Sequence, residues 1–99
     1  MKNIKAAFLD RDGVINYDYG YVHKLEDFKF CDGIFEGLKI LIELNFIIII
    51  VTNQSGIARG IFSETEYKRL TNFMLENLDN HGIKITKIYH CPHHPLFPY

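Results

Sequence analysis

The sequence lacks an excess of charge of either sign. Its 11 lysines and arginines face 12 aspartates and glutamates, which gives a formal net charge of −1. Proteins that hold nucleic-acid phosphates by charge carry a clear basic excess. The composition therefore argues against a nucleic-acid partner, and any anion that binds must be held by a local site.

Long hydrophobic runs and cysteines are also scarce. The longest apolar run, residues 46–51, is far too short to cross a membrane. No secretory signal is recognisable, because Met1 to Asn3 lead directly into a short strand-like run flanked by charges. We therefore expect a cytoplasmic protein without a membrane partner. In such a reducing compartment, Cys31 and Cys91 are not expected to form a disulfide framework.

The chain contains three segments that are typical of β-strands. Residues 4–9 are short, mostly apolar and bounded by a polar turn, which indicates a buried strand. Residues 46–51 lack alternation and are rich in β-branched side chains, so they predict a central strand buried on both faces. Residues 83–89 alternate apolar and polar side chains, as a strand nearer the sheet edge would. Residues 17–30 show no sustained period and are interpreted as an irregular loop or a short hairpin.

Two helices are predicted between these strands. In the first, residues 33–44, Asp32 is the expected N-cap. The second begins with the capping box Ser63 to Glu66 and ends at His81 and Gly82. Its apolar stripe consists of Tyr67, Leu70, Met74 and Leu78. The resulting order β-α-β-α-β predicts an α/β fold with parallel strands and right-handed crossovers, in one domain or part of one.

Polar side chains follow the first and second predicted strands directly. Asp10 and Asp12 lie two residues apart before Gly13, and Thr52 and Asn53 follow the central run. Because the carboxyl ends of parallel strands meet at one rim, where ligands of open α/β sheets bind, these side chains are expected to share a site. One carboxylate could attack phosphorus while the other transfers a proton. Magnesium could bind between the carboxylates and a phosphate, although a lone Asp-x-Asp turn also occurs in calcium sites.

Two further groups of residues allow more than one interpretation. Tyr17, Tyr19 and Tyr21 could form the wall of a pocket or cover the edge of the sheet. Near the end of the chain, three histidines and Cys91 lie within five residues, among prolines. They could bind zinc, which prefers thiolate and imidazole ligands, or be surface side chains of a proline-rich tail.

Four segments together carry a resemblance to a known family. Residues 10–14 (DRDGV) and 50–53 (IVTN) resemble motifs I and II of the haloacid dehalogenase (HAD) superfamily. More narrowly, residues 8–16, 20–22, 51–60 and 91–95 are similar to the D-glycero-D-manno-heptose 1,7-bisphosphate 7-phosphatases. The related histidinol-phosphate phosphatases share much of this pattern.

The resemblance implies a role for each matched residue. Asp10 would be the nucleophile that forms an aspartyl-phosphate, and Asp12 would protonate the leaving group and then activate water. Magnesium would be bound by Asp10 and Asp12, the latter through its main-chain carbonyl, and Thr52 would hold the transferring phosphoryl group. Cys91 and His93 would be half of a structural zinc site. The other implied substrate-binding residues are Arg11, Asp18, Tyr21, Asn53, Gln54, Ser55 and Arg59.

The resemblance also implies the architecture. It predicts a capless, HAD-like, Rossmann-like parallel sheet with helices on both faces, truncated after the third strand. Residues 1–99 would be the N-terminal part of a single phosphatase domain. The family's phosphate-neutralising lysine, its late acidic residues and its second pair of zinc cysteines have no counterpart here. The alternatives are a histidinol-phosphate phosphatase and a truncated, inactive remnant that binds phosphate. An unpaired sheet edge predicts self-association.

Overall fold

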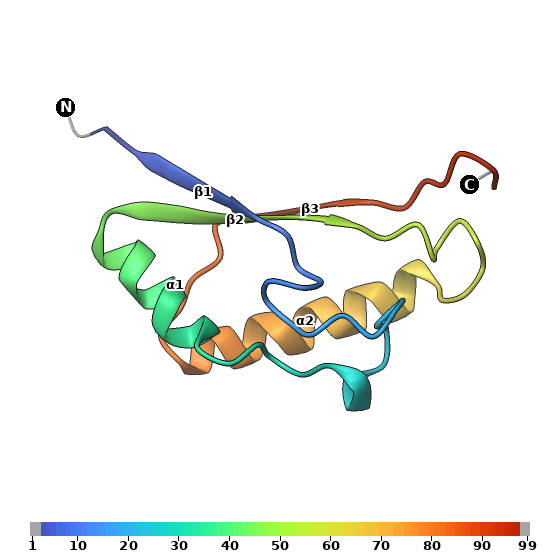
Figure 1. Cartoon of the computed structure of the whole chain (residues 1–99), viewed down its shortest axis with the longest axis horizontal. Helices are drawn as coiled ribbons and strands as arrows, with labels where there is room; N and C mark the ends of the chain where they lie inside the picture. The colour runs from blue at the N-terminus through green and yellow to red at the C-terminus, as the bar shows by residue number, and fades with distance from the viewer. Residues whose placement is uncertain (1–2, 98–99) are drawn as a thin grey trace.

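A parallel sheet with a helix in each crossover forms the framework of the molecule (Figure 1). The computed structural model describes residues 3–97, so four positions of the predicted 1–99 domain lie outside the described residues. The elements are β1 (Lys5–Leu9), α1 (Ile34–Glu43), β2 (Phe46–Asn53), α2 (Glu64–Asn80) and β3 (Lys87–Cys91), with one 3-10 turn at Leu25–Asp27. The predicted α/β class is confirmed.

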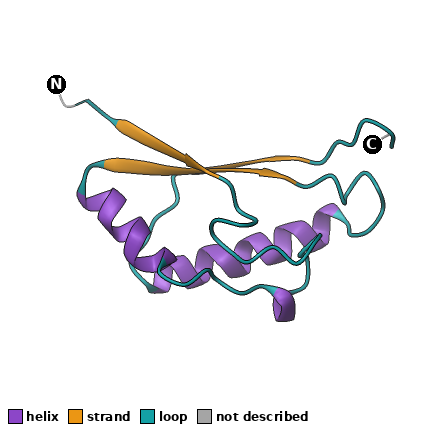
Figure 2. Ribbon diagram, in the orientation of Figure 1, coloured by secondary structure: helices purple, strands orange, loops and turns teal. Residues whose placement is uncertain are grey.

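The strand order β1-β2-β3 places β2 at the centre of the sheet. Figure 2 shows the strands as one layer with the helices beneath it. Both pairings are parallel, with Leu9 opposite Ile50 and Val51 opposite Tyr89. The central position predicted for the apolar run of β2 is therefore confirmed. The predicted burial of β2 on both faces is wrong, because Val51 is 44% exposed, and so is the predicted burial of β1, where Phe8 is 65% exposed. The carboxyl end of β2 meets the carboxyl end of each neighbour, which brings the polar residues that follow the strands to one rim.

Both helices lie on the same face of the sheet (Figure 1). The resemblance predicted helices on both faces, but no helix within residues 3–97 covers the other face. Ile48 and Ile50 face the helices and are fully buried, whereas Val51, on the other face, is 44% exposed. The reason is topological: two right-handed crossovers that progress in one direction across a sheet place their helices on one side.

One main hydrophobic core fills the space between the sheet and the helices. Leu38 of α1 and Ile48 and Ile50 of β2 contribute to it. The predicted stripe of α2 is buried at each of its positions, namely Tyr67, Leu70, Met74 and Leu78. The 3.6-residue period therefore identified the buried face of α2 correctly.

The two helices begin differently. At α2 the predicted capping box is present, because the Ser63 hydroxyl accepts from the Glu66 N–H while the Glu66 carboxylate accepts from the Ser63 N–H. At α1 the prediction of Asp32 as N-cap is wrong. Gly33 holds that position with φ 80°, and no side chain caps the helix. A left-handed backbone favours glycine, so the turn into α1 is set by Gly33.

The third strand begins four residues later than predicted. Ile83 is buried in the core and Thr86 donates its N–H to the Ile48 carbonyl, but ladder pairing with β2 starts at Lys87. In residues 83–86 the alternation of apolar and polar side chains therefore comes from packing against the core, and only from Lys87 on does it accompany strand pairing. None of the helices within residues 3–97 is long and apolar enough to span a membrane.

Candidate active site

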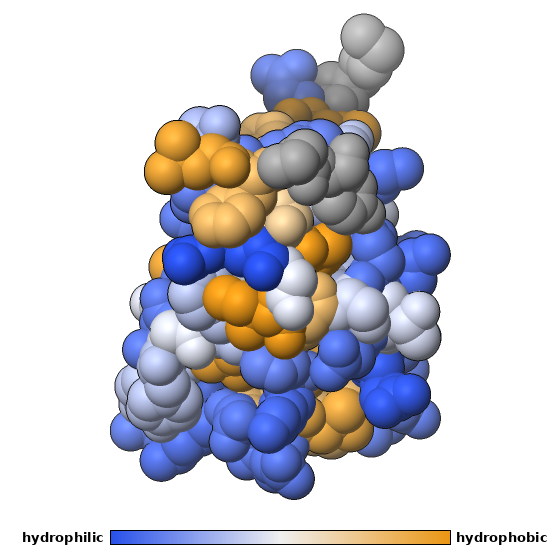
Figure 3. All heavy atoms as spheres, turned by 90° about the vertical axis from the view of Figure 1, so that its right-hand side faces the viewer, coloured by the Kyte–Doolittle hydropathy of each residue, from blue (hydrophilic) through white to orange (hydrophobic). Residues whose placement is uncertain are grey.

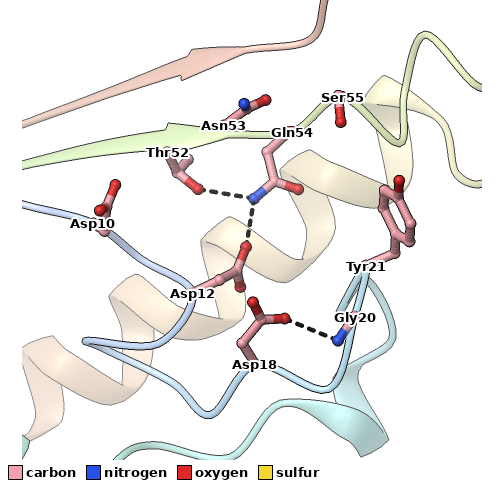
Figure 4. A pocket seen from close by; sticks show the side chains of 9 residues that line it. All are labelled: Asp10, Asp12, Asp18, Gly20, Tyr21, Thr52, Asn53, Gln54 and Ser55. Atoms are coloured by element: carbon pink, nitrogen blue, oxygen red, sulfur yellow. Dashed lines mark hydrogen bonds between the residues drawn. The ribbon is translucent and has the colours of Figure 1, made fainter. Parts of the chain in front are cut away.

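A pocket of about 400 Å³ opens at the carboxyl ends of β1 and β2 (Figure 4). The residues around it come from the two strand ends and from the loop after β1. They are Asp10, Asp12, Asp18, Gly20, Tyr21, Thr52, Asn53, Gln54 and Ser55. The two predicted catalytic residues and six of the eight predicted substrate-binding residues therefore lie around one cavity.

Three side chains hold the Asp12 carboxylate in place. Its Oδ1 accepts from Arg11 (Nη2 at 2.7 Å and Nε at 3.0 Å) and from Asn16 Nδ2 at 3.0 Å, while Oδ2 accepts from Gln54 Nε2 at 3.1 Å. Hydrogen bonds to a charged donor are the stronger kind. The side chain is therefore fixed by neighbours from both strand ends before any ligand binds.

Arg11 lies behind Asp12, away from the pocket. Its side chain is 2% exposed, donates to the Val22 carbonyl at 2.9 Å and has its guanidinium carbon 5.9 Å from the centre of the Phe28 ring. The resemblance implied that Arg11 binds substrate, but the structure buries the side chain as a support for Asp12. An arginine can be buried in this way because its charge is paired with Asp12 and because Nη2 also has the Val22 carbonyl as acceptor.

Gln54 connects the ends of the strands. Its side-chain amide donates to both Asp12 Oδ2 and the Thr52 hydroxyl, the latter at 2.9 Å (Figure 4). Its backbone N–H donates to the Cys91 carbonyl at 2.7 Å, at the end of β3. Gln54 and Thr52 are 4% and 3% exposed. One buried residue thus fixes the hydroxyl of Thr52 relative to the carboxylate of Asp12.

Asp10 is the exposed carboxylate at the end of β1 and lies on the pocket's β1 side (Figure 4). Asp10 is open to solvent, whereas the Asp12 side chain is only 21% exposed. The two acids therefore differ in surroundings although only one residue separates them. Such a difference allows two carboxylates to take two roles.

The loop after β1 forms the outer wall. Asp18 Oδ1 accepts from the Gly20 N–H at 2.8 Å, and Tyr21 follows with φ 51°. Of the two roles considered for Tyr21, pocket wall or cover of the sheet edge, the structure supports the first, because Tyr21 lines the pocket. Tyr17 has another contact, because its hydroxyl accepts from the Asp32 N–H at 3.1 Å.

Arg59 lies at the rim of the pocket, outside its lining. Its guanidinium donates to the Tyr21 hydroxyl and lies between two aromatic rings, 5.5 Å from the centre of Tyr21 and 5.3 Å from that of Phe97. Three loops therefore meet at this arginine. Figure 3, viewed from the right-hand side of Figure 1, shows apolar atoms in the upper and central part of this side and hydrophilic atoms over most of the rest.

The charge of the pocket is negative. Asp10, Asp12 and Asp18 line it, and none of the lining residues within the described chain is a lysine or arginine. A phosphate dianion would be repelled unless a cation joined it. Magnesium is commonly held by one or two carboxylates together with a substrate phosphate, so Asp10 with its neighbours fits such an ion. No three acidic or other ligand side chains of residues 3–97 are grouped to hold a metal by themselves.

The predicted zinc ligands lie at the other end of this rim. Cys91 is exposed at the end of β3, and residues 3–97 contain no group of three or more side chains placed to hold a metal ion. The neighbouring His90 makes structural contacts: its Nε2 is 2.9 Å from Glu64 Oε1, and its ring stacks on that of Tyr67 with the centroids 4.2 Å apart. Zinc binding stays a prediction.

Sequence reasoning missed two residues of the site, Asn16 and Gly20. Asn16 is fully buried and donates to Asp12, four residues before it in the chain. Gly20 lines the pocket with φ 88°. Both fall in segments that carry the family resemblance, which was the only signal that could have found them. Spacing alone does not show that an asparagine will fold back onto a preceding acid.

The known proteins to which this chain is similar are heptose 1,7-bisphosphate phosphatases. No family model matches the chain. A Campylobacter jejuni D-glycero-alpha-D-manno-heptose-1,7-bisphosphate 7-phosphatase is 56% identical over 89 residues, 90% of this chain and 52% of the relative. A Photorhabdus laumondii D-glycero-beta-D-manno-heptose-1,7-bisphosphate 7-phosphatase is 50% identical over 95% of this chain and 50% of the relative.

A solved structure of a heptose bisphosphate phosphatase also resembles this chain in three dimensions. The D,D-heptose 1,7-bisphosphate phosphatase of B. bronchiseptica, complexed with magnesium and phosphate, is 31% identical and superposes with a TM-score of 0.87. The match covers 94% of this chain and 52% of that one. The chain spans about half the length of the curated relatives it matches. Along nearly its whole length, the chain is therefore similar to about half of the heptose 1,7-bisphosphate phosphatases, and it has a HAD-like α/β fold.

Proposed function

We propose that this chain carries the nucleophile, the acid–base residue and the phosphate-holding threonine of a magnesium-dependent sugar-phosphate phosphatase. The observation that carries the proposal is the convergence of Asp10, Asp12 and Thr52 on one pocket at adjacent strand ends. The substrate that the relatives' names favour is D-glycero-D-manno-heptose 1,7-bisphosphate, hydrolysed at the 7-phosphate. In this proposal, residues 1–99 form the N-terminal part of a single phosphatase domain.

The reaction would proceed in two steps. An Asp10 carboxylate oxygen forms a bond to phosphorus as the bond from phosphorus to the sugar oxygen breaks, and Asp12 gives its proton to that oxygen. Asp12 then takes a proton from water as the water oxygen attacks phosphorus, which releases inorganic phosphate and restores Asp10. Splitting one hard displacement into two is the usual advantage of a covalent intermediate.

The other pocket residues would bind the substrate. The Thr52 hydroxyl, oriented by Gln54, would donate to a phosphoryl oxygen, and Asn53 and Ser55 offer further polar groups beside it. Magnesium, held by Asp10 and by the Asp12 carbonyl, would neutralise phosphate charge. Arg59 and Tyr21 at the rim would meet the distal part of the sugar, where a guanidinium matches a second phosphate well.

The pocket predicts a low rate for this chain by itself. No lysine lines it within the described residues, and removing one electrostatic stabiliser of a transition state costs about 3–4 kcal/mol. We therefore expect turnover that is at least two orders of magnitude below that of a full-length relative.

Phosphate release distinguishes the candidate substrates. Both anomers of heptose 1,7-bisphosphate and histidinol phosphate would be incubated with the chain and magnesium, with Asp10→Asn as control. We expect slow, magnesium-dependent release from heptose bisphosphate that Asp10→Asn abolishes. Faster release from histidinol phosphate would favour the second substrate. No release above the control from any of them would favour the inactive phosphate-binding alternative.

Three finer assignments accompany this proposal. Cys91 and His93 would be two of the four ligands of a structural zinc site. A phosphorylated sugar as substrate and two free cysteines suit a cytoplasmic enzyme of carbohydrate metabolism. The outer edge of β1, unpaired within residues 3–97, would favour self-association of the isolated chain.

A further inference from the structure

Gly56 differs from the other glycines of the chain in what surrounds its α-carbon. A Cβ added to Gly56 would lie 2.3 Å from Phe62 Cε1 and 2.8 Å from Tyr21 Cδ1. At every other glycine it would have no neighbour within 4 Å. Carbon atoms that are not bonded to each other pack about 3.5–4.0 Å apart. Two aromatic rings therefore occupy the space that a side chain at position 56 would need.

Of these two rings, that of Phe62 has little room to yield. Its side chain is 4% exposed, packs in a small apolar cluster and stacks on the His23 ring with the centroids 5.0 Å apart. The turn that carries Gly56 is tied as well, because the Ala58 N–H donates to the Pro92 carbonyl at 3.2 Å. A methyl group at position 56 would thus be pressed toward its other neighbour.

Tyr21 is the neighbour that can move. Its side chain is 40% exposed, and its backbone has φ 51°, a left-handed conformation that residues other than glycine rarely adopt. Contacts on two sides support it there, since the ring edge lies against Gly56 and the hydroxyl accepts from Arg59. We therefore expect a methyl group at position 56 to displace the Tyr21 ring.

The position of Tyr21 in turn sets one wall of the pocket. Tyr21 and Ser55 lie at the end of the pocket that is away from Asp10 (Figure 4). The Arg59 guanidinium lies 5.5 Å from the centre of the Tyr21 ring and donates to its hydroxyl. Displacing the ring would therefore change this wall and also remove a partner that orients Arg59.

We propose that Gly56 is a positioning residue for substrate selectivity. By leaving room for the Tyr21 ring, it holds Arg59 where a second anionic group of the substrate would lie. The selectivity rests on the proposed function, whereas the placement of Tyr21 and Arg59 rests on packing alone. Gly56 acts only through these neighbours, because it is buried and does not line the pocket. The phosphate that is cleaved, beside Asp10 and Thr52, would not depend on it.

A pair of substitutions separates the contact with Tyr21 from the contact with Phe62. Phe62→Leu removes Cε1, the atom nearest to the added Cβ, so Gly56→Ala in that background has Tyr21 Cδ1 as its closest obstacle. This double variant also keeps the test possible if Gly56→Ala alone does not fold. Phe62→Leu alone is the matched control. Gly37→Ala, which adds the same methyl group in open space within α1, is the second control.

Nuclear magnetic resonance tests the placement without any activity. The Arg59 Nε–H signal should carry a ring-current shift from Tyr21, because aromatic rings shift the resonances of nearby protons. We expect Gly56→Ala with Phe62→Leu to move this signal most of the way toward its position in Tyr21→Leu. Phe62→Leu alone and Gly37→Ala should leave it in place. An Arg59 signal that does not move in the double variant would overturn the proposal.

Phosphate release tests the selectivity. The two substrates are D-glycero-D-manno-heptose 1,7-bisphosphate and p-nitrophenyl phosphate, which has no second anionic group. Relative to Phe62→Leu, the double variant should lose roughly tenfold in its kcat/KM preference for the bisphosphate, as expected for one hydrogen bond to a charged group. The loss should lie in KM, and kcat for p-nitrophenyl phosphate should be unchanged.

The two measurements distinguish the possible failures. An unchanged preference, or an equal loss for both substrates, would overturn the role of Gly56 in selectivity. No release from either substrate by the unmodified chain would refute the proposed function and the selectivity with it. The Arg59 signal would then still decide whether Gly56 places Tyr21 and Arg59.

Discussion

At the scale of single residues, the Asp12 carboxylate is the best-supported group of the site. Arg11, Asn16 and Gln54 all donate to it, and Arg11 is almost completely buried in doing so. Removing one partner of such a pair leaves the other charge without compensation inside the protein. The contacts that hold this carboxylate in place should therefore also stabilise the fold.

Arg11→Met tests this double role. The substitution keeps most of the apolar stem but removes the donors to Asp12 and to the Val22 carbonyl. We expect the free energy of unfolding, measured by urea denaturation, to fall by about 3 kcal/mol. Arg69→Met, at an exposed position of α2, is the control and should change it by less than about 0.5 kcal/mol. Equal losses in both variants would refute the supporting role of Arg11.

Cys31 gives a prediction about pH. Burial, and to a lesser extent the neighbouring Asp32 carboxylate, raise the pKa of the Cys31 thiol. Its contribution to stability is therefore complete below the unfolded pKa and is lost as the pH rises through the folded pKa. In a Cys91→Ser variant, alkylation of Cys31 should show a higher pH midpoint in the native protein than in urea. The same midpoint in both states would contradict the raised pKa.

At the scale of elements, two glycines of the α1 region should respond to alanine with opposite signs. Gly33 has φ 80° before the helix, whereas Gly37 lies within it, and a Cβ added at either position would have open space for 4 Å around it. Gly33→Ala should destabilise by about 1–2 kcal/mol because a left-handed backbone disfavours a side chain. Gly37→Ala should stabilise by about 0.5–1 kcal/mol because alanine loses less entropy in a helix.

Thermal or urea unfolding of the two variants checks this pair, and each serves as the control of the other. Both substitutions add one methyl group in open space, so packing cannot explain a difference between them. Changes of the same sign would show that the turn before α1 does not depend on the left-handed conformation of Gly33.

The elements also show what the sequence could predict. The α2 capping box and stripe depend on residues within one turn or two of each other, so local pattern was sufficient. The faces of β2 could not be assigned in the same way. A run of isoleucines looks identical whether one or both faces are covered, and only the direction of the two crossovers decides.

The site was predictable to a similar extent. Because Asp12 follows β1 and Thr52 lies at the carboxyl end of the adjacent parallel strand β2, their meeting at one rim could be foreseen. The burial of Arg11 could not, since a charged residue beside an active-site acid is expected to face solvent or substrate. Its partners, the Val22 carbonyl and the Phe28 ring, are distant in sequence.

At the scale of the whole molecule, three carboxylates around one pocket should link folding to magnesium. A cation that binds the folded state stabilises it, by about 2.7 kcal/mol at 100 times the dissociation constant. MgCl₂ should therefore raise the melting temperature, by at least about 4 °C per kcal/mol for a chain of this size. Asp10→Asn should lose most of the rise. An equal rise with NaCl at matched ionic strength would show that only screening is involved.

The exposed face of the sheet, opposite the helices, has a spectroscopic consequence. The sequence contains no tryptophan, so Val51→Trp would place a single indole on the exposed side of β2, where 44% of Val51 is accessible to water. Its emission would report the polarity of that one surface without interference from another tryptophan. A blue shift would report in real time any covering of this face, in a molecule whose own fluorescence comes from tyrosine.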